Sequence, residues 1–266
     1  MSNKPDYKNW VPKSMITGLA MGTALCGAAF ALSGKVLSNA PDAARSAAQA
    51  AFGAGTVGFL GATVWMTALH RTFDYNGKRK MAKQIIDGTA AYVTIPDGGT
   101  GLDVGCGSGA LTIACAKRNP NAQMVGCDIW RGAYKAVFTK SRCEENAAAE
   151  GVENARFEEG NAIKLPFDDE CFDAVTSNYV YHNIAGKNKQ ELLLETLRVL
   201  KNGGTFAIHD LMSKARYGDM EAFVSRLKSI GYEDVRLIDT TDGSFMTRRE
   251  AALLGLSGST LLVGKK

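Results

Sequence analysis

The sequence predicts an α/β protein with a mostly parallel sheet that is covered by helices on both faces and preceded by two hydrophobic helices. From residue 75 onward, short strand-like runs alternate with helix-like runs, the pattern of parallel strands joined by helical crossovers. The first strand-like run ends in a glycine-rich turn that leads into a helix. Before residue 70, two long uncharged runs predict a pair of hydrophobic helices.

The composition is that of a globular domain with an appendage. The 266 residues are 45% hydrophobic and 22% charged, and the net charge of +4 is too small to indicate nucleic-acid binding by itself. The six cysteines form no C-x-x-C pair, which predicts reduced thiols in a cytoplasmic compartment and not disulfides or a zinc site. No metal-binding cluster is visible in the sequence.

The two uncharged runs cover residues 15–32 and 47–69, with lengths of 18 and 23 residues. Each is long enough to cross a bilayer, the first only just. Gly18 and Gly22 form a G-x-x-x-G pattern, which lets two helices approach closely in lipid. The runs therefore predict a transmembrane helical hairpin.

Basic residues around the runs predict the orientation of this hairpin. Three lysines precede it and five basic residues follow it before residue 84, whereas the connection carries only Lys35 and Arg45. By the positive-inside rule, both ends then face the cytoplasm. We therefore expect a membrane-anchor region over residues 1–70 and a cytoplasmic catalytic domain over residues 71–266.

Other interpretations of the two runs stay open. The first run follows basic residues, as the apolar part of a signal peptide does. Both runs also suit buried helices, a mobile arm, or helices through which the chain forms an oligomer.

The remaining elements follow in order along the chain. Residues 75–77 are expected to form a turn, and Asp219 is a candidate N-cap for the helix that it begins. The expected helices are 78–91, 111–117, 134–150, 187–200 and 219–230. The expected strands are 100–104, 124–129, 155–158, 172–177, 204–210, 235–239 and 260–263.

The turn after the first strand is the most informative stretch. Asp103 is followed by Gly105, Gly107 and Gly109, and a helix begins directly after them. Glycines tolerate positive φ and let a ligand approach the backbone without meeting a Cβ. The helix N-terminus adds unpaired N–H groups and a partial positive charge. The turn therefore predicts a binding site for a ligand that carries a carboxylate or phosphate.

A second acid stands at the end of the next strand. Asp128 comes 25 residues after Asp103. A carboxylate at this place can accept hydrogen bonds from both ribose hydroxyls of an adenosine, as in dinucleotide-binding folds. A solvated acid at a strand end is the plainer alternative.

Together these motifs resemble those of a known enzyme family. The acid and the G-x-G-x-G turn are similar to motif I of the class I S-adenosylmethionine-dependent methyltransferases. Glu159-Gly160-Asn161-Ala162 resembles the family's Gly-Asp-Ala segment, with an amide in place of the acid, and Asn202 stands where the family usually has proline. The resemblance covers about residues 75–266 and implies a Rossmann-like sheet of seven strands, the last one antiparallel.

The resemblance also implies S-adenosyl-L-methionine as the cofactor. Asn161 is then expected to accept a hydrogen bond from the adenine amino group, and Tyr75 either stacks over the cofactor or lies at the membrane interface. The expected cofactor-binding residues are Tyr75, Asp103, Gly105, Cys106, Gly107, Gly109, Asp128, Ile129, Asn161, Ala162 and Asn178.

The candidates for catalysis follow the fourth strand. Asn178 is expected at the carboxyl edge of the sheet, where open α/β sheets bind their ligands. His182 is the candidate general base, because imidazole exchanges protons near neutral pH. A histidine that packs at the edge of the pocket is the alternative. His209 with Asp210 forms a second candidate pair.

The sequence thus predicts methyl transfer from S-adenosyl-L-methionine to a small-molecule or lipid-like acceptor, as in the quinone-type branch of the family, at the cytoplasmic face of the cell membrane. The segment 177–183 lacks the Asn/Asp-Pro-Pro-Tyr pattern of the family's nucleic-acid enzymes, which disfavours a nucleic-acid acceptor. Two other functions stay open: a nicotinamide-dependent oxidoreductase, and a non-enzymatic membrane protein that binds the cofactor as a sensor.

Overall fold

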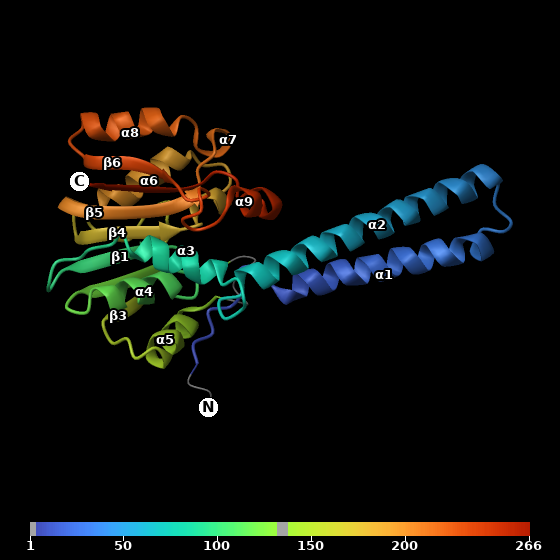
Figure 1. Cartoon of the computed structure of the whole chain (residues 1–266), viewed down its shortest axis with the longest axis horizontal. Helices are drawn as coiled ribbons and strands as arrows, with labels where there is room; N and C mark the ends of the chain where they lie inside the picture. Colours follow the sequence, from blue (N-terminus) through green and yellow to red (C-terminus); the bar gives the residue numbers. More distant parts are fainter. Residues whose placement is uncertain (1–3, 132–137) are drawn as a thin grey trace. The chain divides into compact units, whose positions relative to one another are not determined.

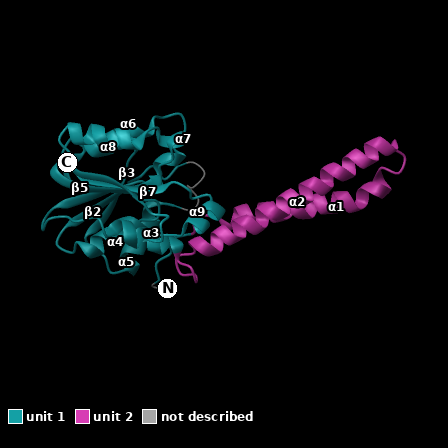
Figure 2. Ribbon diagram, turned by 45° about the horizontal axis from the view of Figure 1, so that its top comes forward, with its two compact units in different colours: residues 1–8, 81–266 teal, residues 9–80 magenta. Residues whose placement is uncertain are grey.

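The computed structural model describes residues 4–131 and 138–266. The chain forms two compact units, one of residues 9–80 and one of residues 1–8 with 81–266 (Figure 2). The observed division therefore follows residue 80, and the N-terminal segment belongs to the larger unit although the hairpin separates the two in the sequence.

The smaller unit is an antiparallel pair of long helices (Figure 1). α1 (Lys13–Val36) and α2 (Asp42–Phe73) extend beyond the expected runs at both ends, and each begins directly after a proline, Pro12 or Pro41. A Cβ at Gly22 would lie 2.9 Å from the ring of Phe59, whereas one at Gly18 would have no neighbour within 4 Å in the part of the chain that the structure describes. Of the two glycines in the G-x-x-x-G pattern, only Gly22 therefore contributes to the close contact between α1 and α2.

Large apolar side chains of this unit are exposed. Leu25, Val36 and Val57 have 68%, 75% and 72% of their surface exposed. A helix from the core of a globular protein buries such side chains, because each stabilises the fold by about 1.5–3 kcal/mol when it leaves water. The two helices are each long and apolar enough to cross a membrane by length and composition.

The larger unit contains a seven-stranded sheet. The strands are β1 (Thr100–Val104), β2 (Gln123–Asp128), β3 (Ala155–Glu159), β4 (Phe172–Asn178), β5 (Leu200–Leu211), β6 (Glu233–Asp239) and β7 (Ser259–Lys265). Their order is β3-β2-β1-β4-β5-β7-β6. β1 to β5 pair with one another in parallel, and β7 is antiparallel to both β5 and β6. The expected Rossmann-like sheet with an antiparallel last strand is confirmed.

Helices cover both faces of this sheet. The helices of the unit are α3 (Met81–Ala90), α4 (Ala110–Arg118), α5 (Lys140–Ala149), α6 (Lys189–Arg198), α7 (Lys214–Tyr217), α8 (Met220–Ser229) and α9 (Arg248–Leu254), with a 3₁₀ turn η2 (Tyr181–Asn183). α3, α4 and α5 lie on one face and α6 and α8 on the other (Figure 2). Part of the expected helix 134–150, residues 134–137, lies outside the described residues.

Local chemistry explains several helix boundaries. The side chain of Asp219 accepts a hydrogen bond from Ala222 N, so the expected N-cap of α8 is confirmed. α9 was not expected from the sequence, although Thr247 and Glu250 form a capping box at its start. Its seven residues are too few for a helical hydrophobic period to be recognised.

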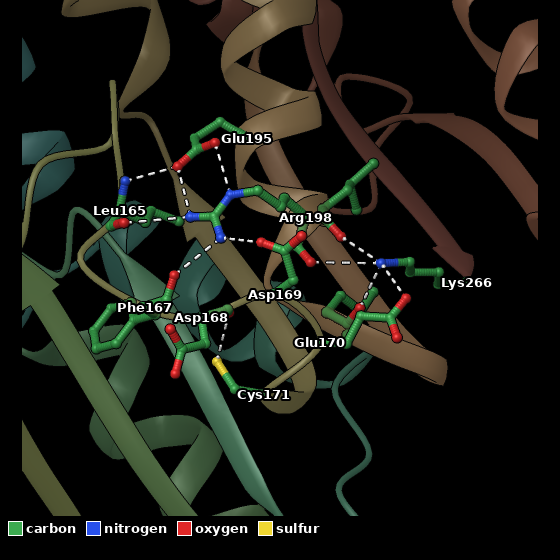
Figure 3. Close-up of polar contacts among 11 residues, drawn as sticks. Leu165, Phe167, Asp168, Asp169, Glu170, Cys171, Glu195, Arg198 and Lys266 are labelled. Carbon is green, nitrogen blue, oxygen red and sulfur yellow. Dashed lines mark hydrogen bonds and ion pairs between the residues drawn. The ribbon is translucent and has the colours of Figure 1, made fainter.

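At the edge where the parallel strands begin, Arg198 fixes the connection between β3 and β4 (Figure 3). Its guanidinium donates to the carbonyl of Phe167 at 2.9 Å, to Asp169 at 2.6 Å and to Glu195 at 2.9 Å. Glu195 in turn accepts from Leu165 N at 2.8 Å. These bonds tie the connection to α6 on the side of the sheet away from the glycine turn.

Candidate active site

The chain order places a crevice at the carboxyl end of β1. From β1 the chain continues to β2 and β3 on one side, and β4 then pairs with the other side of β1. This is the topological switch point at which open α/β sheets bind their ligands. The glycine turn, Asp128 and Asn178 end the three strands that meet here.

The three glycines of the turn have positive φ angles of 73°, 56° and 81° at positions 105, 107 and 109. A Cβ at Gly105 would lie 2.3 Å from Val180 Cγ2, and one at Gly109 would lie 3.0 Å from the ring of Phe157. At Gly107, in contrast, the nearest atom among the described residues is in Phe138, at 3.9 Å from such a Cβ. Gly105 and Gly109 therefore allow close packing, and Gly107 leaves an open approach to the backbone.

The carbonyls of this turn are held by three side chains. Gly107 O accepts from Trp130 Nε1 at 3.0 Å and from Cys143 Sγ at 3.2 Å. Ser108 O accepts from Asn146 Nδ2 at 2.9 Å. In a trans peptide the N–H points opposite to the C=O. Fixing these carbonyls therefore also fixes the direction of the N–H groups of residues 108 and 109.

Asn146 also binds the N-terminal segment. Its Oδ1 accepts from Asp6 N at 2.7 Å, and its Nδ2 donates to Asp6 O at 3.2 Å. The hydroxyl of Tyr7, a residue with only 4% of its surface exposed, donates to Glu150 at 3.0 Å. Residues 6 and 7 are thus fastened to α5, which itself holds the glycine turn. Nothing in the sequence pattern indicates this contact.

Asp128 accepts two backbone hydrogen bonds. Its Oδ2 accepts from Gly107 N and its Oδ1 from Trp130 N, both at 2.9 Å. A carboxylate oxygen can accept a second hydrogen bond, so both oxygens keep acceptor capacity. The neighbouring Ile129 is 43% exposed. Trp130 has a φ of 40°, an uncommon value for a bulky residue.

Asp103 lies at the base of the turn, and its side chain contacts α4. The residue is only 1% exposed, and Thr112 Oγ1 donates to its Oδ2 at 2.7 Å. Burial raises the pKa of this carboxyl to about 7, although the hydrogen bond from Thr112 opposes the shift. The buried thiol of Cys106 lies beside Cys143, and burial raises its pKa well above the ordinary value, which keeps it protonated.

The remaining predicted cofactor residues lie on two loops. Asn161 Oδ1 accepts from Ile163 N at 3.0 Å, which shapes the loop after β3, and Ala162 is 9% exposed. Tyr75 belongs to the smaller unit, so its contact with a cofactor stays a prediction. Among the described residues, no cluster of histidine, cysteine, aspartate or glutamate is arranged to hold a metal ion.

The segment after β4 packs against the glycine turn and carries His182. Val180 fills the space that Gly105 leaves. His182 lies on η2, where its ring Nδ1 is 2.5 Å from Asp210 Oδ1. The backbone N–H of His182 donates to the other oxygen, Asp210 Oδ2, at 3.2 Å. Burial by itself would raise the pKa of Asp210, but its hydrogen bond and charge interaction with His182 hold that pKa below the ordinary value.

His209 is not the partner of Asp210. Neighbouring residues of a strand point to opposite faces, so His209 and Asp210 lie on different sides of β5. Both nitrogens of His209 are engaged: Nδ1 lies 2.8 Å from Asn178 Oδ1, and Nε2 lies 2.9 Å from Thr240 Oγ1. Burial lowers its pKa to about 3. The expectation of a His209–Asp210 pair was wrong, and Asp210 pairs with His182.

The strand order and the glycine turn at the switch point are those of the α/β proteins that bind nucleotide-type cofactors at this edge of the sheet. Residues 95–233, just over half of the chain, match the family model described as "Methyltransferase domain". The chain therefore belongs to this family.

Two relatives of known name illustrate the similarity. The chain is 34% identical over 130 residues to the arsenite methyltransferase of Halobacterium salinarum, covering 48% of this chain and 31% of that protein. It is 29% identical over 143 residues to the demethylmenaquinone methyltransferase of Bacillus cytotoxicus, covering 53% and 57%. The chain spans only about a third to somewhat over half of the length of these relatives. A third relative, the demethylmenaquinone methyltransferase of Roseiflexus castenholzii, is covered over 45% of its length.

Solved structures share the fold at low sequence identity. The cyclase SpnF matches with a TM-score of 0.53 and 18% identity, over 73% of this chain and 85% of that one. The geranyl diphosphate C-methyltransferase of Streptomyces coelicolor matches with a TM-score of 0.51 and 15% identity, over 72% and 85%. One of these neighbours is named as a cyclase and the other as a methyltransferase, so the shared fold by itself does not identify the reaction.

Proposed function

We propose that this protein transfers the methyl group of S-adenosyl-L-methionine to a small, lipid-like acceptor that binds beside His182. The observation that carries the proposal is the hydrogen-bonded pair of His182 and Asp210, on a segment that packs against the glycine turn through Val180. When bound, S-adenosyl-L-methionine supplies a methyl group on a positively charged sulfur. The protein then has to align the acceptor and remove its proton.

The crevice fits an adenosine cofactor that carries an amino-acid tail. The open face of Gly107 accommodates a ligand against the backbone, and the free acceptor capacity of Asp128 suits the two ribose hydroxyls. The N-terminus of α4, which no side chain caps, suits a carboxylate. The loop of Asn161 and Ala162 ends the neighbouring strand β3, where the resemblance expects adenine.

His182 suits the role of general base. When its Nδ1–H donates to Asp210, the lone pair is on Nε2, which can accept a proton from a hydroxyl or amine. The lowered pKa of Asp210 keeps this carboxylate ionised, and the negative charge stabilises the imidazolium that forms. Membership in the methyltransferase family favours methyl transfer over the nicotinamide-dependent alternative.

The names of several similar proteins support a lipid-like acceptor. Relatives from Bacillus cytotoxicus and Roseiflexus castenholzii are named for demethylmenaquinone, and one structural neighbour for geranyl diphosphate. An acceptor of this class dissolves in or at a membrane. The proposed hairpin would keep the enzyme beside it.

The proposal therefore includes anchoring of the chain in the cell membrane by α1 and α2. At about 1.5 Å per residue, the 24 and 32 residues of these helices reach about 36 and 48 Å, more than the roughly 30 Å of a bilayer core. Their outward apolar side chains would face lipid. The distribution of basic residues favours a cytoplasmic catalytic unit.

The test of activity uses full-length protein in lipid vesicles with methyl-labelled S-adenosyl-L-methionine. Demethylmenaquinol and a membrane lipid extract serve as acceptors, and the label is expected in an extractable product. His182→Ala and Asp210→Asn should each lower the rate by about 10²–10⁴-fold with unchanged affinity for S-adenosylhomocysteine. Asn183→Ala, an exposed position on the same turn, is the matched control. A loss below threefold for His182→Ala would exclude the general base, and bound cofactor without any labelled product would favour the sensor.

The test of anchoring is a carbonate wash of membranes that contain the full-length protein. We expect the protein to stay with the membranes. Replacing Val57 and Val64 by lysine places two charges on exposed apolar positions and should release the protein. Ser46→Lys, near the start of α2, is the control that should stay bound. Wild-type protein in the soluble fraction without detergent would contradict the anchor and favour an oligomer through these helices.

A further inference from the structure

Behind Asn178 lies a buried chain of hydrogen bonds that the proposed mechanism does not use. His209 Nε2 is 2.9 Å from Thr240 Oγ1, which is 3.0 Å from the carbonyl oxygen of Ser259. His209, Thr240 and Ser259 are fully buried, whereas Asn178 is half-buried at the carboxyl end of β4. The chain therefore runs from β7, past the end of β6 and through β5, to the edge of the crevice.

Counting protons shows which way these bonds run. Ser259 O is a carbonyl and can only accept, so the single hydroxyl proton of Thr240 fills that contact. Thr240 Oγ1 must then accept from Nε2–H of His209. A neutral imidazole carries one proton, so Nδ1 of His209 is an acceptor. The structure places Oδ1 of Asn178 2.8 Å from this nitrogen. The two ends of an amide have nearly the same shape, so the contact gains a proton when the amide turns to present Nδ2 as the donor.

The opposite direction satisfies fewer contacts. If His209 carried its proton on Nδ1, Thr240 would donate to Nε2, and its 3.0 Å contact with Ser259 O would place two oxygens together without a proton. Ser259 O would still accept from Thr240 N at 3.2 Å, but the two acceptor oxygens would repel each other at this distance. Protonation of both nitrogens is disfavoured because burial lowers the pKa of His209 to about 3. The ring centroids of Tyr179 and Phe245 lie 4.7 and 5.3 Å from the centroid of the His209 imidazole. These two rings restrict the orientation of the imidazole plane.

We infer that Ser259, Thr240 and His209 form a positioning relay that turns the side-chain oxygen of Asn178 toward the crevice. The oxygen and nitrogen ends of an amide have nearly the same shape, so its partners decide its orientation. Resting on the proposed function, this orientation sets a requirement: the ligand group at Asn178 is a hydrogen-bond donor. An ammonium group of the cofactor or an N–H or O–H of the acceptor meets that requirement.

The first test reads the tautomer of His209 directly. Full-length protein with ¹⁵N-labelled histidine is examined by long-range ¹H–¹⁵N correlation, and His70→Gln and His182→Gln variants assign the signals of the three histidines. We expect a proton on Nε2 of His209 at pH 7 and still at pH 5. A proton on Nδ1 would overturn the relay. Asn178→Asp cannot donate to Nδ1 and should move the proton to that atom.

The second test finds the donor. Asn178→Leu keeps the side-chain volume and removes the oxygen; Asn183→Ala is the control. A tenfold or greater loss of affinity for S-adenosylhomocysteine, with unchanged affinity for 5′-methylthioadenosine, which lacks the amino-acid part, assigns the donor to the cofactor. Unchanged affinity for both with a raised KM for demethylmenaquinol assigns it to the acceptor. No change in any of the three refutes the requirement for a donor.

These readouts test the relay separately from the proposed methyl transfer. The tautomer measurement needs no turnover, so an Nε2–H tautomer in a protein without methyl transfer would refute the proposed function and support the relay. A Thr240→Val variant removes the hydroxyl and should yield a mixture of His209 tautomers. An unchanged single tautomer in that variant would show that Thr240 does not set the direction of the bonds.

Discussion

Asp103 gives the α/β unit a pH-dependent stability. In the folded chain its carboxyl has a pKa raised from 3.8 to about 7 because the side chain is buried at the base of the glycine turn. Between pH 3.8 and 7 the folded chain keeps this proton and the unfolded chain has lost it. Stability therefore falls as the pH rises through this window, by up to roughly 1.4 kcal/mol per pH unit. The full span of about three units corresponds to about 4 kcal/mol.

The substitution Asp103→Asn removes the titration and keeps the shape of the side chain. Thr112 can still donate its hydroxyl proton to the amide oxygen. Below pH 4 the variant is expected to have nearly the wild-type free energy of unfolding. As the pH rises to 8, the variant should become more stable relative to the wild type, by about 4 kcal/mol in total.

Urea unfolding of full-length protein in detergent, followed at pH 4 to 8 for wild type and variant, measures this difference. Asp97→Asn, at an exposed acid in the loop before β1, is the control against which the difference for Asp103→Asn is compared. A flat difference for Asp103→Asn would refute the reasoning. So would a variant that becomes less stable relative to wild type as the pH rises.

Three further predictions concern cofactor binding, measured as affinity for S-adenosylhomocysteine by titration calorimetry. Asp128→Asn removes the charge from the hydrogen bonds to ribose and should weaken binding by about ten- to a hundredfold; unchanged affinity would exclude the ribose contact. Gly107→Val should not bind, because its side chain enters the open space on the ligand side, and the φ of 56° at this position also strains the variant. Gly105→Ala should destabilise the fold by colliding with Val180. Normal binding by Gly107→Val would disprove the open approach. Deletion of residues 1–8 removes the hydrogen bonds between Asp6 and Asn146 as well as the buried Tyr7. It should lower the free energy of unfolding by roughly 2–4 kcal/mol and weaken binding severalfold. An affinity equal to that of wild type would show that this segment does not support the turn.

Much of the fold follows from local patterns. The strands were placed within a few residues because apolar runs of a buried sheet are bounded by turn residues such as Gly151 and Gly231, both of which adopt positive φ. The glycine turn and Asp128 were recognised because their chemistry depends on spacing along one short stretch of chain. α9 and α7 were not predicted, since elements of seven and four residues carry too little periodicity to be recognised.

The partners within the site could not be obtained in this way. Asp210 was considered as a candidate partner of His209, its neighbour in sequence, whereas the structure pairs it with His182. Adjacent residues of a strand face opposite sides of the sheet, so sequence proximity is misleading there. Asn146 and Tyr7 gave no signal, because ordinary polar and aromatic residues acquire their roles only from what the fold places beside them.

By itself, the sequence determined the fold class of this protein: an α/β unit with a glycine-rich turn after its first strand, an acid at the end of the second strand, and two apolar helices before the unit. These are properties of short segments, in which residue types and spacings carry the chemistry directly. The tertiary structure alone decided the hydrogen-bond partners of the two candidate histidines. His182 keeps one nitrogen beyond its bond to Asp210, whereas both nitrogens of the buried His209 are engaged. Burial and hydrogen-bond partners fix protonation, and both arise only when strands distant in the sequence are brought together.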